Sequence, residues 1–329
     1  MTTEIHEVAN LPAVMSAIRL GEPGEPAALA YEQVATPRPG LGEVLVRVHA
    51  AAITRDELGW PAGRLPATPS YEFSGVVAQV GRSVTGVAAG DTVYALSGFD
   101  RDGAAAEYVV VSYQFVAPKP RTLGHVASAA IPLAALTAWQ GMFDHGRLVE
   151  GERVLIHGAA GGVGGFAVQL AHARGAYVIG TASTGHLETV SDLGADEVVD
   201  RTRERFEDAV DRVDLVFDTA GGDRLERSLA VLEAGGRLVS VASEPPQEQA
   251  AARGIEALYF VVEPNREQLA ELATLADRGE LRPTIDAVFP LREARQAFER
   301  SLAGDRPGKI VLSVVEEAGE RTDQPAIQK

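Results

Sequence analysis

The stretch from Val154 to Gly164 constrains the fold of this chain more than any other part of its sequence. It reads Val-Leu-Ile-His-Gly-Ala-Ala-Gly-Gly-Val-Gly, so an apolar run passes through small residues into a helical segment. This matches the dinucleotide-binding pattern as Ala159-x-Gly161-x-x-Gly164, with Ala in the first glycine slot. Free N–H groups and the helix dipole of the first helical turn would then bind phosphates. The residues predicted to bind the cofactor here are Ala159, Ala160, Gly161, Gly162, Val163 and Gly164.

A glycine-rich turn by itself can be only a tight connection, so its surroundings decide the interpretation. Short apolar strands are predicted at Val154–His157, Tyr177–Thr181, Glu197–Asp200, Leu215–Asp218, Arg237–Val241 and Leu258–Val262. Helices are predicted at Gly165–Arg174, His186–Leu193, Arg203–Val210, Arg224–Leu232 and Arg266–Arg278. Six strands with crossover helices predict an α/β fold with a doubly wound parallel sheet of the Rossmann type.

The first 120 residues have a different pattern. Short strands with glycine turns are predicted at Met15–Leu20, Glu43–Ala52, Phe73–Val80, Thr92–Leu96 and Ala106–Val111. An Ala-rich helical segment, Val126–Phe143, follows and is interrupted by Pro132, and strand signals return after Leu281. We therefore expect a discontinuous β-rich domain and an inserted cofactor domain. The predicted division is a flexible leader 1–14, a β-rich domain 15–123 and 281–315, a Rossmann domain 124–280 and a flexible tail 316–329.

Charge and cysteine content exclude several classes of function. The chain has 329 residues and a formal net charge of −16, which repels nucleic-acid phosphates and anionic membrane surfaces. It has no cysteine, which excludes disulfides, thiolate catalysis and cysteine-ligated metal sites. No apolar run is long enough to span a membrane. We expect a cytoplasmic protein that binds neither nucleic acid nor membrane.

The end of the second Rossmann strand indicates which dinucleotide is bound. NAD-preferring sites usually carry an acidic residue there, about 20 residues after the glycine turn, to bind the ribose 2′-OH. Here the segment 180–186 has no acid, and hydroxyl groups with a nearby cation would accept a 2′-phosphate. Thr181, Ser183, Thr184 and Arg201 are therefore predicted to bind NADPH. The alternative is that Ser183 and Thr184 cap the next helix and that Arg201 is solvated.

Several separate segments together resemble the medium-chain dehydrogenase/reductase superfamily, in particular its zinc-independent quinone oxidoreductase branch. The resemblance covers roughly Met15 to Val315, and the clearest segments occur in the order typical of the family. They are Pro39–Ala52, Gly75–Asp91, Pro132–Trp139, Val154–Gly164, Leu193–Asp200, Phe217–Gly222 and Gly308–Leu312.

This resemblance implies a GroES-like catalytic domain, a Rossmann domain, and a cleft between them in which NADPH reduces a quinone or an α,β-unsaturated carbonyl. It also implies a homodimer formed through edge strands, for which Leu258–Val262 is suited. Zinc-bearing relatives have Cys at the position of Thr54 and His at that of Tyr71, so zinc is not expected here. Glu72 remains from that pattern and is interpreted as a structural hydrogen-bond or ion-pair partner. Thr54 also departs from the Asn of many zinc-free members.

The family pattern also predicts residues for the chemistry. Thr54, Tyr71 and Thr137 are the predicted catalytic residues; Tyr71 is the protein's proton-donor candidate, with solvent as its competitor, and Thr137 could instead bond its own helix backbone. Thr54, Trp60 and Phe99 are predicted to line the substrate site, although aromatic residues in such loops also serve as core. Further cofactor contacts are predicted at Ala220, Gly221, Ser243, Phe260, Val261 and Lys309. Lys309 could equally be a surface lysine.

Two other functions stay open at this point. One is an enoyl-thioester reductase of lipid or polyketide metabolism, which would need an apolar tunnel and a basic entrance. The other is a non-catalytic NADPH-binding protein. The leading hypothesis is an NADPH-dependent reductase of quinones or enones.

Overall fold

The structure is a computed structural model that describes residues 11–61, 63–304 and 306–315. The predicted tail 316–329 and residues 1–10 of the predicted leader lie outside these ranges. The first strand, β1, begins at Val14, one residue inside the predicted leader. Within the described ranges, no helix has both the length and the apolar character needed to cross a membrane.

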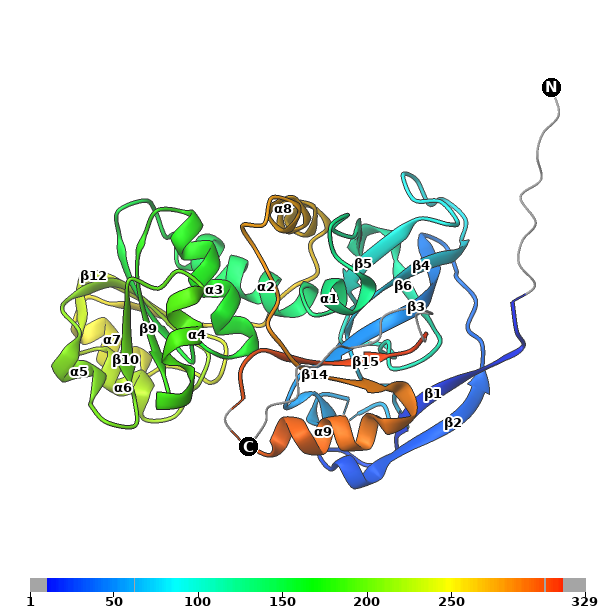
Figure 1. Ribbon diagram of the computed structural model, residues 1–329, viewed down its shortest axis with the longest axis horizontal. Coiled ribbons are helices and arrows are strands. Elements are labelled where there is room, and N and C mark those ends of the chain that lie inside the picture. Colours follow the sequence, from blue (N-terminus) through cyan, green and yellow to red (C-terminus); the bar gives the residue numbers. More distant parts are fainter. Residues whose placement is uncertain (1–10, 62, 305, 316–329) are drawn as a thin grey trace, which may run out of the picture.

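The chain folds into two lobes, each built around its own large sheet (Figure 1). One lobe contains a six-stranded sheet in the order β10-β9-β8-β11-β12-β13, in which every neighbouring pair is parallel. Its strands are β8 (Arg153–His157), β9 (Tyr177–Ala182), β10 (Glu197–Asp200), β11 (Val213–Asp218), β12 (Leu232–Ser240) and β13 (Glu256–Tyr259). The strand order reverses between β8 and β11, and ligands bind at such a switch point in open α/β sheets.

Helices cover both faces of this sheet, which confirms the predicted doubly wound fold. They are α3 (Gly162–Ala173), α4 (Leu187–Asp192), α5 (Phe206–Ala209), α6 (Arg224–Ser228) and α7 (Gln247–Ala252). Helix α8 (Arg266–Asp277) follows β13 and lies between the two lobes (Figure 1). Side chains that alternate along one strand enter different cores: Val154 and Ile156 of β8 pack in one hydrophobic cluster, and Leu155 packs in another. Continuous apolar strands are expected where both faces of a parallel sheet are buried.

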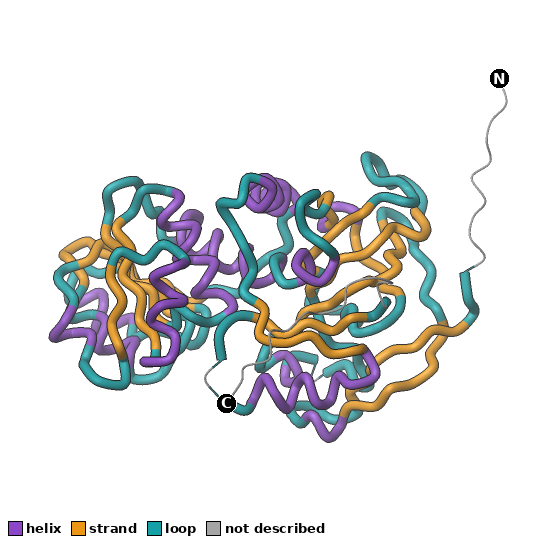
Figure 2. The backbone as a smooth tube through the Cα atoms, in the orientation of Figure 1, coloured by secondary structure: helices purple, strands orange, loops and turns teal. Residues whose placement is uncertain are grey.

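The other lobe contains a mostly antiparallel sheet in the order β14-β15-β3-β4-β5-β7, with β6 also paired to β3. Its strands are β3 (Glu43–Ile53), β4 (Glu72–Val80), β5 (Thr92–Leu96), β6 (Tyr108–Ser112), β7 (Val116–Pro118), β14 (Ile285–Pro290) and β15 (Lys309–Ser313). β15 pairs antiparallel with β3, so strands from the first 120 residues and from the last part of the described chain form one sheet. The tube in Figure 2 shows this lobe as mainly strand and loop. The residue boundaries predicted for the two domains remain a proposal.

The segment between the lobes is helical and is interrupted at Pro132, as the sequence predicted. The expected helix Val126–Phe143 is divided into α1 (His125–Ala129), α2 (Pro132–Trp139) and the π-helical turn η4 (Gln140–His145). Pro132 causes the break, because it lacks an N–H group and is favoured at the first position of a helix. Helix α2 packs against α3 of one lobe, against β4 and β5 of the other, and against α8 between them. It therefore connects the two sheets through their shared core.

Some elements were missed or misplaced by the sequence pattern. Strand β2 (Leu29–Ala35), which pairs with β1, was not predicted, nor was helix α9 (Ala294–Leu302) among the strand signals after Leu281. Helix α6 ends at Ser228 rather than Leu232, because Leu232 already pairs with Val213 as the first residue of β12. Five short 3₁₀ helices complete the described elements: η1 (Pro26–Ala28), η2 (Glu57–Gly59), η3 (Tyr113–Phe115), η5 (Thr184–His186) and η6 (Leu291–Glu293).

Candidate active site

One cavity of about 1170 Å³ lies between the glycine turn and the mostly antiparallel sheet of the other lobe. It joins the carboxyl ends of the parallel strands to loops from β3 and β15, which is where the fold predicts a ligand site. The predicted residues that line it are Thr54, Trp60, Phe99, Thr137, Ala160, Gly161, Gly162, Val163, Thr181, Ser183, Arg201, Ala220, Gly221, Ser243, Phe260, Val261 and Lys309. Four predicted residues, Tyr71, Ala159, Gly164 and Thr184, do not line this cavity.

The glycine turn has the geometry of a phosphate-binding helix start. Helix α3 begins at Gly162 and leaves the N–H groups of its first turn without intrahelical acceptors. Gly164 lies under the turn, where a Cβ atom would come within 2.1 Å of the Gly158 carbonyl oxygen. The close passage of helix and strand therefore requires glycine at this position, although Gly164 itself does not face the cavity. A Cβ at Gly162 would meet Lys309 Cδ at 2.7 Å, so this glycine makes room for the lysine stem.

The hydroxyl groups after β9 have separate roles. Ser183 lines the cavity and is half-buried. Thr184 instead donates to Asp200 Oδ2 at 2.6 Å, and this hydrogen bond is the main reason that the pKa of Asp200 is lowered. The backbone N–H of Arg201 donates to the Ala182 carbonyl at 2.9 Å, so Arg201 is held beside the end of β9. The structure thus brings Ser183 and Arg201 together at one end of the cavity and turns Thr184 away from it.

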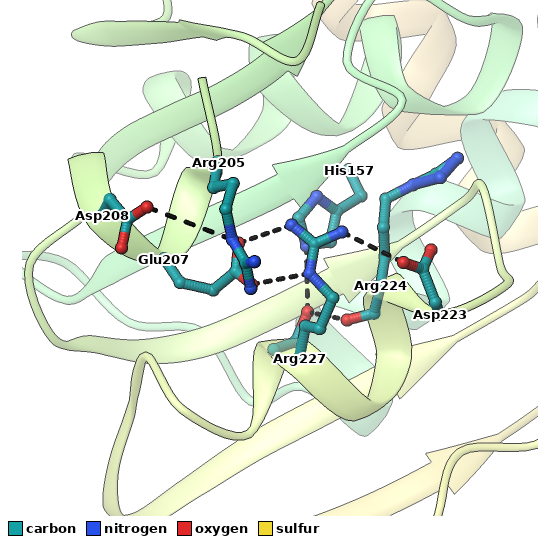
Figure 3. A network of polar contacts seen from close by, with 8 residues as sticks. His157, Arg205, Glu207, Asp208, Asp223, Arg224 and Arg227 are labelled. Carbon is teal, nitrogen blue, oxygen red and sulfur yellow. Dashed lines mark hydrogen bonds and ion pairs between the residues drawn. The ribbon is translucent and has the colours of Figure 1, made fainter. Parts of the chain in front are cut away.

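A second arginine at this end, Arg224, was not predicted. It is the first residue of α6, follows the loop after β11 and lines the cavity. In Figure 3 its guanidinium extends away from the cluster around Arg227. The signal that could have identified it is the position of the loop, because the loops at the carboxyl ends of parallel strands border ligand sites.

The polar cluster drawn in Figure 3 lies beside Arg224, which lines this end of the cavity. Arg227 makes two 2.6 Å hydrogen bonds to Glu207, which lower the pKa of Glu207 to about 2, and it also bonds to Asp223. Its guanidinium lies over the Phe206 ring, which in turn meets the His157 ring edge to face. His157 contacts the hydroxyls of Thr181 at 3.2 Å and Ser228 at 2.9 Å. Burial lowers the pKa of His157 to about 3, so its ring is neutral behind the glycine turn.

Local charge at the cavity opposes the charge of the whole chain. The described lining residues include two acidic side chains, Asp56 and Asp286, and a larger set of basic ones. The basic residues are Arg55, Arg201, Arg224, Arg306 and Lys309. A chain with a net charge of −16 therefore presents an excess of cations where a diphosphate would lie.

The opposite end of the cavity is organised by a buried ion pair. Lys309 is only 7% exposed, and its Nζ lies 2.6 Å from Glu72 Oε1. The same ammonium donates to Thr54 Oγ1 at 3.1 Å. Glu72 is fully buried, and its other oxygen accepts from the backbone N–H of Leu133 at 2.8 Å. Glu72 thus has the structural ion-pair role that the sequence indicated, whereas Lys309 is not the surface lysine of the alternative interpretation.

A second buried carboxyl, Glu57, lies beneath the same loop. It accepts hydrogen bonds at 3.1 Å from the backbone N–H groups of Thr54 and Ser70. Burial raises the pKa of Glu57 to about 8, although the positive charge of Lys309 acts in the opposite direction. Glu57 therefore holds a proton at neutral pH and fixes the backbone of Thr54. From the sequence, Glu57 was expected in the segment that lines the substrate cleft, or else facing water; in the structure it is buried and does not line the cavity.

Aromatic side chains form one wall of this end. Trp60 and Phe99 both line the cavity, and their rings meet edge to face with centroids 5.2 Å apart. Tyr71 packs against both rings but is fully buried, and burial raises the pKa of its hydroxyl. Thr137 lines the cavity and also donates to the Leu133 carbonyl at 2.6 Å, as in the backbone-bonding alternative. Across the cavity, Phe260 packs on the His145 ring at 4.5 Å.

No group of three or more His, Cys, Asp or Glu side chains in the described ranges is arranged to hold a metal ion. Thr54 and Tyr71, the two positions for which the family resemblance implies zinc ligands in zinc-bearing relatives, offer a hydroxyl and a buried phenol. These are poor zinc ligands compared with thiolate and imidazole.

Comparison with known proteins matches both lobes. Residues 40–121 match the model described as alcohol dehydrogenase GroES-like domain, and residues 193–312 match that described as zinc-binding dehydrogenase. The chain is 35% identical to 2-methylene-furan-3-one reductase of Solanum lycopersicum, over 92% of this chain and 80% of that protein. It is 33% identical to the chloroplastic NADPH-dependent alkenal/one oxidoreductase of Arabidopsis thaliana, over 92% and 81%. The solved quinone oxidoreductase from Coxiella burnetii superposes with a TM-score of 0.87 at 33% identity, covering 92% of this chain and all of that one.

Proposed function

Because this chain belongs to the medium-chain dehydrogenase/reductase superfamily, in its quinone oxidoreductase-like branch, we propose that it is a zinc-independent, NADPH-dependent reductase of quinones or α,β-unsaturated carbonyls. The observation that carries the proposal is the single cavity that joins the phosphate-binding turn at Gly162 to the aromatic wall at Trp60 and Phe99. Two relatives are named for the reduction of conjugated carbonyl compounds, and a solved relative is named for quinones.

The choice of NADPH rests on the end of the cavity near β9. The segment 180–186 has no acidic side chain that would repel a 2′-phosphate. Arg201 and Arg224 both line this part of the site, and Ser183 adds a hydroxyl group. A guanidinium is well suited to a phosphate because it can donate two parallel hydrogen bonds. One relative is named as NADPH-dependent, which supports the same choice.

When bound, the reduced nicotinamide would supply the hydride, and the protein's residues would orient and enclose the reactants. Gly161, Gly162 and Val163 would hold the diphosphate at the start of α3. Ser243, Phe260 and Val261 follow β12 and β13 and would border the nicotinamide, opposite Thr137. Trp60 and Phe99 would hold a flat, apolar acceptor. The residues around the nicotinamide would thus exclude water, and the aromatic wall would fix the position of the acceptor.

A direct assay tests this proposal. Purified protein is mixed with NADPH and either 1,4-benzoquinone or an alkyl enone, and the absorbance band of the reduced cofactor is followed. We expect turnover with one or both acceptors. Turnover of enoyl thioesters alone would support the enoyl-thioester reductase alternative, and tight NADPH binding without turnover of any acceptor would support a non-catalytic role.

We also propose a cytoplasmic homodimer. Strand β13 lies at one edge of the parallel sheet, where it pairs with β12 on one side. An unpaired apolar edge strand is suited to pairing with a second copy. Light scattering coupled to size-exclusion chromatography measures the mass directly, and a mass of one chain would contradict the dimer. Cell fractionation tests the compartment.

A further inference from the structure

The side chain of Lys309 crosses the site and ends at the substrate side of it. Its stem passes the start of α3, where Gly162 leaves room for it, and its ammonium lies against Glu72 and Thr54. The distances are 2.6 Å from Nζ to Glu72 Oε1 and 3.1 Å from Nζ to Thr54 Oγ1. If Lys309 served only to bind the phosphates of the cofactor, its ammonium would not need to lie against the Thr54 hydroxyl.

Thr54 connects this ammonium to the cavity. It is partly exposed and lines the cavity beside Trp60, and its backbone is held by Glu57. A threonine hydroxyl can accept one proton while it donates another, which the amide of an asparagine does poorly. The Thr54 hydroxyl can therefore pass on a proton that it receives from the ammonium beside it.

Tyr71, the other protein group with a transferable proton, is placed less well. It is fully buried, it does not line the cavity, and its hydroxyl has no hydrogen-bond partner among the described residues. A general acid must come within hydrogen-bond reach of the atom that it protonates. Thr54 meets this requirement for a molecule in the cavity, whereas Tyr71 does not in this structure.

We propose that the Thr54 hydroxyl donates the proton that completes reduction of the acceptor, and that the Lys309 ammonium replaces this proton. The inference rests on the proposed function, because it assigns the second half of the same reduction. Thr54 is the catalytic residue of this step, and Lys309 acts only through it.

With an enone as the acceptor, each bond that forms is matched by one that breaks. A hydride from the reduced nicotinamide dinucleotide forms the new C–H bond at the β-carbon, and the electron pair of the C=C bond moves to give an enolate. The Thr54 O–H bond breaks as its proton passes to the enolate, and an N–H bond of Lys309 breaks as a proton passes to Thr54. Lys309 is left as a neutral amine and regains a proton from water after the product leaves.

The surroundings of Lys309 hold its ammonium in position for this transfer. Glu72 cannot easily turn away, because its second oxygen accepts from the Leu133 N–H at the start of α2. The buried carboxyl of Glu57 also lies near this lysine, but it holds its own proton at neutral pH, so Glu72 is the anion that pairs with the ammonium. The remaining N–H groups of the lysine are thus left to Thr54 and to the cavity.

The first test compares Thr54→Val, which keeps the shape and removes the hydroxyl, with Thr54→Ser, which keeps the hydroxyl. With an alkyl enone we expect Thr54→Val to lower kcat by about 10²- to 10⁴-fold, the usual contribution of general acid catalysis. Thr54→Ser should retain most of the activity, and the dissociation constant of NADPH should change little in either variant. With benzoquinone the loss should be smaller, because a reduced quinone is a weaker base and can leave before it is protonated.

The second test uses Lys309→Ala and small primary ammonium ions added to the assay. We expect these ions to restore part of the enone activity, at rates that rise with their acid strength, because proton transfer follows Brønsted behaviour. Equal rescue by all ammonium ions, whatever their acid strength, would show a merely electrostatic role for Lys309 and would overturn its part in the relay. If Lys309→Ala does not fold, the Thr54 pair still decides the hydroxyl step.

The outcomes separate this inference from the proposed function. If the wild-type protein reduces neither quinones nor enones, both fail together. If it reduces enones and Thr54→Val does so equally well, the relay is wrong and the function stands. A large loss in Tyr71→Phe with none in Thr54→Val would assign the proton to Tyr71 and overturn the inference.

Discussion

The two ends of the cavity are built in different ways. The nucleotide end is made mainly of backbone: a strand, a turn of small residues and the first turn of α3, with Gly164 allowing the helix to approach. The substrate end is made of side chains, with the ammonium of Lys309 held between Glu72 and Thr54. Backbone geometry follows from local sequence, but a buried charge pair depends on residues that meet only after folding. Substitutions at the substrate end should therefore act mainly on stability, and substitutions at the nucleotide end mainly on cofactor affinity.

The largest effect is expected at the substrate end. Lys309→Met should lower the free energy of unfolding by about 3–5 kcal/mol, because it leaves the buried Glu72 carboxylate without its partner. Urea denaturation with comparison of midpoints measures this. The exposed pair Arg147–Glu256 offers the matched control, and Arg147→Met should have a far smaller effect. The double variant Lys309→Met/Glu72→Leu should recover much of the loss; no recovery would mean that the pair is not the source of the stability.

At the nucleotide end the principal effect should fall on cofactor affinity. A Cβ at Gly164 would collide with the Gly158 carbonyl, and such overpacking costs about 1–3 kcal/mol. Gly164→Ala should therefore weaken NADPH binding by about 10-fold or more, as measured by calorimetric titration. The control is Gly185→Ala, where an added Cβ meets nothing within 4 Å. Equal weakening in both variants would contradict the close-approach argument.

The two ends should also respond to pH with opposite signs. Burial lowers the pKa of His157 to about 3 from its ordinary 6.5, so the unfolded chain binds more protons and stability falls as pH drops below 6.5. Burial raises the pKa of Glu57 to about 8 from 4.5, so the folded state binds more protons and stability falls as pH rises from 4.5 to 8. Each group changes stability by at most about 1.4 kcal/mol per pH unit.

Urea denaturation between pH 4 and 8 tests this opposition. Above pH 6.5 only Glu57 of these two groups acts, so stability should decline towards pH 8, and Glu57→Gln should flatten that decline. His125, whose pKa burial lowers to about 4, adds to the acid limb. A decline towards pH 8 that is unchanged in Glu57→Gln would show that Glu57 is not buried as a neutral acid.

The smallest effect is expected from the exposed cation at the nucleotide end. Arg201→Ala should weaken NADPH binding about 3- to 10-fold, which corresponds to about 0.6–1.4 kcal/mol for one hydrogen bond near solvent, and should leave NADH binding nearly unchanged. Arg224→Ala tests the arginine that the sequence pattern missed. Parallel titrations with both dinucleotides measure the selectivity. Equal weakening of NADPH and NADH would remove the arginine concerned from 2′-phosphate recognition.

The sequence predicted the nucleotide end well because its signals are local. The six parallel strands lie within a few residues of their predicted positions, and the glycine turn and the loops after β9, β11, β12 and β13 supply most of the lining. Thr184 was misplaced because its nearest acceptor, Asp200, lies on a neighbouring strand that only the fold brings close. Helix α9 carries a helical pattern, with Ala294, Ala297 and Phe298 buried, that a closer search for period 3.6 would have found.

The substrate end could not be predicted in the same way. Lys309 and Glu72 lie on strands far apart in sequence, and no local pattern indicates that they form an ion pair. Glu57 follows Asp56 in a polar stretch that resembles an exposed turn, and its burial depends on Thr54 and Ser70 folding over it. Tyr71 was selected for its chemistry, and only the packing of Trp60 and Phe99 shows that its hydroxyl is enclosed.

The backbone contact beside Lys309 has a consequence for protein engineering. Gly308 donates to the Ala160 carbonyl at 3.0 Å and bridges to Gly161, so a strand of one lobe is fastened directly to the turn of the other. Replacing residues 158–164 alone with those of another protein would disturb this backbone contact and would misalign Lys309, which follows Gly308. Coenzyme preference should therefore be redesigned through the segments 183–201 and 219–224. The contact between residues 160 and 308 should be kept unchanged.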